Sequence, residues 1–124
     1  MKPESADYLR KAQVDLDEAD KIAANVAGRS AYYAAFHTAE ALIMERTGKV
    51  AASHKGVRVE FARLTKDEPA LREFTAFLAR AYDLKAPADY SVSPQVQIST
   101  ADAQEAIATA ARFLACMTDL LAVI

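Results

Sequence analysis

Alanine dominates this chain and the residues that interrupt helices are scarce. Alanine accounts for 28 of the 124 residues, whereas glycine occurs three times and proline four times. Alanine has the highest helix propensity, and glycine and proline have the lowest. There is no Asn-Gly or Asp-Gly turn and no sustained alternation of apolar and polar residues, so nothing indicates a strand hairpin. The sequence therefore predicts an all-α fold built from long helices.

Apolar residues spaced alternately three and four positions apart indicate the first and the last helix. The first helix is predicted to begin at Ser5, because serine is a favourable N-cap residue. The second starts somewhere between Ala23 and Ser30 and continues to about Thr47, where Gly48 ends it. These two helices account for most of the first half of the chain.

Three further helices are predicted in the second half of the chain. A short one begins near His54, and another follows Pro69, a residue tolerated at a helix start. Two prolines and several serines predict a loop from Lys85 to Ile98, and the last helix opens with the capping-box pattern of Ser99–Asp102. We therefore expect one domain, residues 1–124, folded as an antiparallel up-and-down bundle of four main helices plus one short extra helix.

Charge and composition exclude several classes of protein. Fifteen basic and seventeen acidic residues give a net charge of −2. A non-specific DNA-binding domain has a pI above ~9, so that class is excluded, although a local basic pocket is not. The lone Cys116 cannot form a disulfide within the chain, and beside Phe113 and Met117 it is interpreted as an inert core thiol. With no membrane-spanning run and no apolar signal core, we expect a cytoplasmic protein.

The densest group of chemically capable side chains lies between Gly28 and His37. Arg29, Tyr33 and His37 are each four residues apart, so they share one ridge of a helix. Arginine can hold a phosphate through two parallel hydrogen bonds, and histidine can exchange protons near neutral pH. In the structural alternative the aromatic rings belong to the core, the histidine is a packing residue and the arginine is solvated. The spacing alone leaves both interpretations open.

Other polar groups do not form a recognisable cofactor or metal site. The acidic run of Asp15, Asp17, Glu18 and Asp20 is interpreted as a solvated helix face rather than a metal cluster. Two histidines and one cysteine offer no zinc-ligand spacing, and no phosphate-binding or dinucleotide-binding glycine motif is present. We therefore expect neither a metal nor a cofactor.

Five segments follow one another in an order that is typical of one family. They are Tyr8-Leu9-Arg10-Lys11-Ala12 with Asp15-Leu16, Tyr32-Tyr33-Ala34-Ala35-Phe36-His37 with Ala41-Leu42-Ile43, His54-Lys55-Gly56-Val57 with Phe61, Ala88-Asp89-Tyr90, and Ala106 through Phe113-Leu114. Together they resemble the HEPN domain family, compact helical domains often encoded beside minimal nucleotidyltransferases. The resemblance spans nearly the whole chain, and the second segment is its most distinctive part.

This resemblance implies a function. Active HEPN proteins are metal-independent endoribonucleases, often toxins, and act as homodimers with the site at the subunit interface. Their motif is an arginine and a histidine, which here implies catalytic roles for Arg29 and His37. The histidine would move protons while a ribose 2′-hydroxyl attacks the neighbouring phosphate, and the arginine would stabilise the negative phosphorane. The substrate-binding candidates around them are Tyr33, His54, Lys55, Lys85, Asp89 and Tyr90.

Two of these candidates also have structural interpretations. His54 precedes a glycine in a predicted turn, where an exposed or helix-capping role is the alternative to contact with nucleic acid. Asp89 could either shape the cleft or hold its own loop through backbone hydrogen bonds. Sequence reasoning does not decide between these roles.

The chain departs from the family motif in its arginines. Seven residues separate Arg29 from His37 where the family has four to six, and Ser30 stands where relatives often carry arginine. Lys85 stands where an arginine is common, and lysine lacks the planar fork of arginine. Arg29 in a loop before the helix would reach farther than Arg29 within it. Two functions stay open: a toxin-type ribonuclease, and a non-catalytic dimer that binds a nucleotide, RNA or a nucleotidyltransferase partner.

Overall fold

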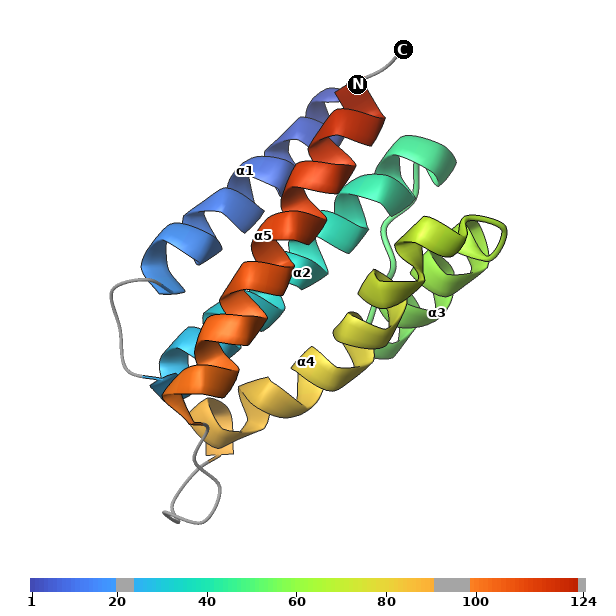
Figure 1. Cartoon of the computed structure of the whole chain (residues 1–124). Helices are drawn as coiled ribbons and strands as arrows, with labels where there is room; N and C mark the ends of the chain where they lie inside the picture. The colour runs from blue at the N-terminus through green and yellow to red at the C-terminus, as the bar shows by residue number, and fades with distance from the viewer. Residues whose placement is uncertain (20–23, 91–98, 123–124) are drawn as a thin grey trace.

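A computed structural model of the chain describes residues 1–19, 24–90 and 99–122 (Figure 1). These ranges contain five α-helices and one short 3₁₀ helix and no strand, so the all-α prediction is confirmed. The elements are α1 (Pro3–Ala19), α2 (Ala24–Thr47), α3 (His54–Thr65), η1 (Pro69–Leu71), α4 (Arg72–Tyr90) and α5 (Thr100–Ala122).

The four long helices α1, α2, α4 and α5 run alternately up and down, and the shorter α3 lies beside α2 and α4 (Figure 1). Helix α2 is central, because it packs against each of the other four α-helices. Its most extensive contact is with α1. The arrangement fits the predicted bundle of four main helices and one short one.

Large aromatic and aliphatic side chains fill the space between the helices. Tyr32 and Leu42 of α2 are fully buried, and so are Phe61 of α3 and Phe113 of α5. The ring of Phe113 lies 5.2 Å from that of Phe61 and 4.6 Å from that of Phe74 on α4, measured between centroids. Aromatic pairs at these separations add to the free energy of burial, so this cluster ties α3, α4 and α5 together.

The helix ends show which local signals the chain uses. Gly48 ends α2 with a φ of 71°, a conformation that glycine adopts without strain. Ser53 caps α3 by accepting a hydrogen bond from the amide of Gly56, and Ser99 caps α5 in the same way through Asp102. The prediction that Ser5 caps α1 is wrong: α1 begins at Pro3, and the buried Ser5 hydroxyl donates to the Glu45 carboxylate of α2 at 3.0 Å.

Helix α4 extends beyond its predicted end. The prediction of a loop from Lys85 onward is wrong for residues 85–90, because α4 continues through Pro87 to Tyr90. Proline removes one helical hydrogen bond and usually ends a helix, but the alanines on either side of Pro87 favour continuation. Residues 91–98 of the predicted loop lie outside the described residues. On α5, Leu120 is 38% exposed, whereas Leu121 is buried in the core.

Candidate functional site

Helix α2 carries the predicted ridge of Arg29, Tyr33 and His37. Because α2 begins at Ala24, Arg29 lies inside the helix, and the idea of an arginine on a flexible loop is wrong. Its guanidinium carbon lies 4.8 Å from the centroid of the Tyr33 ring, close enough for a cation–π interaction. The ring of Tyr33 is in turn 6.3 Å from that of His37. The three side chains therefore follow one another along the helix.

His37 sits between two carboxylates. Its Nδ1 lies 2.9 Å from Oε1 of Glu40, one turn further along α2, and its Nε2 lies 3.7 Å from Oδ2 of Asp15 on α1. A carboxylate only accepts hydrogen bonds, so Nδ1 is the donor to Glu40. The ring of Tyr8 from α1 stacks on the imidazole at a centroid distance of 6.4 Å. The His37 side chain is 23% exposed, so Nε2 is positioned by its neighbours without being sealed from solvent.

Asp15 is a part of this site that sequence analysis missed. The prediction of a solvated acidic face is wrong for Asp15, whose side chain is only 26% exposed because it faces α2. Burial raises the pKa of the Asp15 carboxyl, and the charges of His37 and Arg29 oppose that rise. Its Oδ2 atom is buried without a hydrogen-bond partner among the described residues. A negative charge is thus held between the histidine and the arginine of the ridge.

A groove between α1 and α2 gives access to this histidine. It has a volume of about 470 Å³, within the usual range for ligand-binding pockets. Its lining consists of charged and polar side chains with one exposed valine: Asp7, Arg10, Lys11, Val14, Asp15 and His37. The groove therefore combines an imidazole with two cations and two carboxylates from α1.

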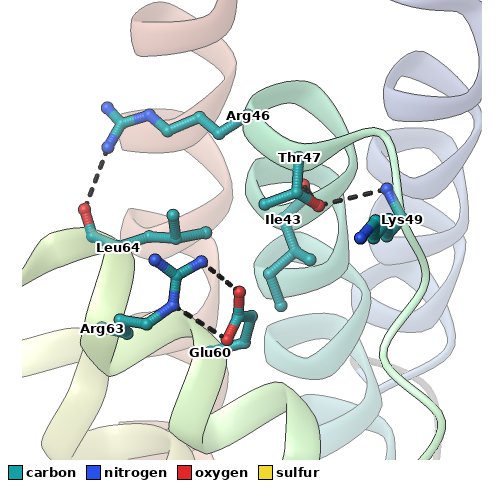
Figure 2. Close-up of polar contacts among 7 residues, drawn as sticks. All are labelled: Ile43, Arg46, Thr47, Lys49, Glu60, Arg63 and Leu64. Atoms are coloured by element: carbon teal, nitrogen blue, oxygen red, sulfur yellow. Dashed lines mark hydrogen bonds and ion pairs between the residues drawn. The ribbon is translucent and has the colours of Figure 1, made fainter.

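A second cavity, of about 440 Å³, lies where the end of α2 passes α3. Arg63 forms an ion pair with Glu60 along one side of it, and Arg46 donates to the carbonyl of Leu64 (Figure 2). Opposite them, the amide of Lys49 donates to the Thr47 hydroxyl (Figure 2). The lining of this cavity contains no imidazole or thiol. It lacks the acid–base chemistry of the groove beside His37, which we take as the candidate site.

His54 occupies a different environment from His37. Its Nδ1 shares a 2.5 Å hydrogen bond with the hydroxyl of the fully buried Tyr32. Its ring also packs 4.8 Å from that of Phe36 and 5.6 Å from that of Tyr82, and burial raises the pKa of Tyr32 far above its ordinary value. The alternative of an exposed or capping His54 is wrong, because the side chain is half-buried and Ser53 is the cap.

Among the remaining substrate-binding candidates, only Lys55 has a side chain within the described residues. Lys55 is exposed on the first turn of α3 and does not line the groove. Lys85, Asp89 and Tyr90 lie on the last two turns of α4, and their side chains are outside the described residues. Cys116 is partly buried against the core, and burial raises the pKa of its thiol.

Some residues of the site could have been found from the sequence and others could not. Glu40 is three positions after His37, and residues three apart are neighbours on a helix surface. Asp15 and Tyr8 come from another helix, so only the packing of α1 on α2 places them beside His37. That register depends on packing along the whole α1–α2 interface, so no local sequence pattern indicates it.

Neither a metal-binding group nor a membrane-spanning helix is present in the described ranges. They contain no group of three or more His, Cys, Asp or Glu side chains arranged to hold a metal ion. Within the same ranges no helix has both the length and the hydropathy needed to cross a membrane.

Comparison with known proteins identifies the family. A search among curated proteins found no match. The sequence model of the HEPN domain matches residues 4–120, which is nearly the whole chain. The helical bundle described above is the all-α fold expected of that domain. The chain therefore belongs to the HEPN domain family, which supports a nucleotide- or RNA-related function at the level of the family.

Proposed function

We propose that this chain is a toxin-type, metal-independent endoribonuclease that acts as a homodimer, with His37 as its proton-transfer group. The observation that carries the proposal is the hydrogen bond between Nδ1 of His37 and the carboxylate of Glu40. Glu40 accepts a hydrogen bond from Nδ1, which fixes the tautomer and leaves Nε2 at the groove. A histidine held by a carboxylate in this way is oriented for general acid–base catalysis.

The proposed reaction needs no cofactor. Nε2 of His37 accepts the proton of a ribose 2′-hydroxyl, and the resulting oxygen attacks the adjacent phosphorus. The bond between phosphorus and the 5′-oxygen of the next nucleotide breaks, and that oxygen leaves as a hydroxyl after it takes up a proton. The products are a 2′,3′-cyclic phosphate and a 5′-hydroxyl. Arg29 would stabilise the negative charge on the phosphorane.

The dimer is part of this proposal because the reaction has two proton transfers. Each chain supplies one histidine in the groove. A two-fold axis would place the same residues of a second copy opposite the first and supply a second imidazole. Leu120 near the end of α5 is 38% exposed and would contribute apolar contact area at such an interface. Sedimentation equilibrium should give twice the monomer mass, and a monomer mass would contradict this arrangement.

The test is an RNA cleavage assay in the presence of EDTA. Wild-type protein should cut single-stranded RNA and leave 2′,3′-cyclic phosphate ends, which mass spectrometry identifies. His37→Ala should lower the rate by roughly 10²–10⁴-fold, the usual contribution of a general acid–base group. Its circular dichroism spectrum should match that of the wild type. Equal cleavage by the two preparations would point to a contaminating nuclease and contradict the proposal.

A second candidate function is binding without cleavage. It is favoured by the position of Arg29, which lies eight residues from His37 on the same rigid helix and is stacked on Tyr33. At ~1.5 Å per residue the two positions are about 12 Å apart along the axis, too far to meet at one phosphate without inward-leaning side chains. A dimer that bound RNA, a nucleotide or a nucleotidyltransferase partner would not need that convergence. Tight binding of unmodified RNA that stays intact would select this function.

A further inference from the structure

The second cavity, where the end of α2 passes α3, takes no part in the proposed reaction. Its volume of about 440 Å³ is within the usual range for pockets that bind small molecules. The lining comes from the end of α2, from residues 49–52 and from one face of α3. It shares no residue with the groove beside His37, so the two sites are separate.

Apolar side chains form one part of this lining. Ile43 is only 2% exposed, and Ala51 packs against the hydrophobic core. Val50 and Ala52 also line the cavity, and the side chain of Val50 is 60% exposed. A ligand that covered these side chains with an alkyl or aryl group would remove apolar surface from water, which favours binding.

Three charged side chains complete the lining, and their charges do not balance. Arg63 donates hydrogen bonds from Nε and Nη2 to the Glu60 carboxylate, so these two residues form a neutral pair. The same hydrogen bonds lower the pKa of Glu60, and the charge of Lys49 adds to that effect, so Glu60 is ionised at neutral pH. Lys49 forms no ion pair with any residue that the structure describes. The lining therefore carries one uncompensated positive charge.

The end of α2 fixes the backbone of Lys49 beside the cavity. Gly48 turns the chain with a φ of 71°, and the amide of Lys49 donates to the Thr47 hydroxyl at 3.1 Å (Figure 2). That hydroxyl donates in turn to the carbonyl of Ile43 at 2.7 Å. Figure 2 shows Lys49 on one side of Ile43 and the ion pair of α3 on the other. The lysine side chain itself is exposed, so its ammonium group is accessible to a ligand.

We propose that this cavity binds a small organic monocarboxylate, with its apolar group against Ile43 and Val50 and its carboxylate at the ammonium of Lys49. One unbalanced positive charge matches one negative charge. A phosphate monoester carries about −1.5 to −2 charges at pH 7, and the ionised Glu60 would repel the excess. A ligand with an ammonium group would be repelled by Lys49. The inference depends neither on RNA cleavage nor on the groove beside His37.

NMR titration of ¹⁵N-labelled protein with alkyl carboxylates tests the site. Hexanoate should shift the amide signals of residues 48–52 and Gly56 in a saturable way and leave those of Val14 and His37 unchanged. Each methylene that becomes buried between butanoate and hexanoate should tighten binding by up to about fourfold, the equivalent of ~0.8 kcal/mol. Hexanol should bind roughly two- to fivefold more weakly than hexanoate, because it lacks the ion pair.

Three variants separate the charge from the apolar contacts. Lys49→Gln should weaken hexanoate binding by roughly two- to fivefold, the contribution of one exposed ion pair, and leave hexanol binding unchanged. Val50→Asp places a negative charge at an exposed position of the lining, so hexylamine should then bind more tightly than hexanoate. Lys66→Gln, the same charge change at an exposed residue outside the lining, should bind hexanoate as the wild type does. Circular dichroism should show that all three variants are folded.

Three results would overturn the proposal. Equal affinities for hexanoate and hexanol, or equal hexanoate affinities of wild type and Lys49→Gln, would show that the cavity does not recognise a carboxylate. Tighter binding of hexyl phosphate than of hexanoate would show that the charge count does not select a single negative charge. Shifts that do not saturate, or that spread to Val14 and His37, would show that the carboxylate has no site in this cavity.

Discussion

The two histidines of the chain both pack against Phe36, yet their surroundings differ. His37 is held by the carboxylates of Glu40 and Asp15 and opens on a groove with cations. His54 is hydrogen-bonded to the buried phenol of Tyr32 and packed among aromatic rings at the start of α3. A neutral partner inside a core stabilises one tautomer and one position of the ring. Charged partners at a solvent-accessible groove favour proton exchange instead.

Residue type and spacing are therefore not enough to identify a functional histidine. Both histidines have aromatic neighbours within about 6 Å, since the Phe36 ring lies 5.5 Å from that of His37 and 4.8 Å from that of His54. The two histidines differ in their polar partner, which is a carboxylate for His37 and a phenol for His54. They also differ in access, because only His37 lines the groove. We therefore expect loss of the Glu40 contact to His37 to change activity, and loss of the Tyr32 contact to His54 to change stability.

Among the residues that hold the two histidines, Glu40 is expected to give the largest effect. Glu40→Gln keeps the volume of the side chain but replaces the acceptor of the Nδ1–H bond with an amide that can turn either its donor or its acceptor to the ring. His37 would lose its fixed tautomer, and we expect kcat for RNA cleavage to fall by roughly tenfold to a hundredfold, a part of the contribution of the histidine itself. KM should change little, because Glu40 acts through His37 and does not contact the strand.

The control for Glu40→Gln is a substitution of the other histidine, His54. His54→Ala should retain the cleavage rate of the folded protein. Rate measurements on Glu40→Gln, His54→Ala and wild type under the same EDTA-containing conditions separate the two environments. A normal kcat in Glu40→Gln would show that the carboxylate does not orient a catalytic imidazole.

The next effect, on stability, is expected at Tyr32. Tyr32→Phe removes the hydroxyl that bonds to Nδ1 of His54 and leaves the aromatic core otherwise filled. Loss of one hydrogen bond to a half-buried group should lower the free energy of unfolding by about 1–2 kcal/mol. Urea unfolding followed by circular dichroism measures this change. Unchanged stability together with impaired cleavage would indicate that His54 takes part in catalysis, and that the two histidines do not differ in role.

The fold was more predictable from the sequence than the site, for identifiable reasons. Helix content, the end of α2 at Gly48 and the cap of α5 at Ser99 depend on local backbone preferences. Such preferences can be read from a short segment of the sequence. The end of α4 is harder to predict, because the tendency of Pro87 to end a helix competes with the helix propensity of the alanines beside it.

The charged part of the site depends instead on how two helices meet. The ridge of Arg29, Tyr33 and His37 follows from a spacing of four. The contact between Asp15 and His37 depends on the relative shift and rotation of α1 against α2, which side-chain packing over the whole interface decides. The same limit explains why the sequence alone does not mark Lys11 as a groove residue or show that His54 contacts Tyr32.

The smallest effect is expected at Asp15, and it depends on pH. Burial raises the folded-state pKa of this carboxyl above its ordinary value, with His37 and Arg29 opposing the rise. A raised folded-state pKa means that the stabilising contribution is complete below the unfolded-state pKa and is lost as the pH rises through the folded-state pKa. At neutral pH the ionised carboxylate therefore costs stability, and Asp15→Asn, which carries no charge, should be slightly more stable than wild type. The gain in stability should disappear when urea unfolding is repeated at about pH 3, below the ordinary pKa of an aspartate side chain. A variant less stable than wild type at neutral pH would mean that attraction to His37 and Arg29 outweighs desolvation, and that the groove prefers its carboxylate ionised.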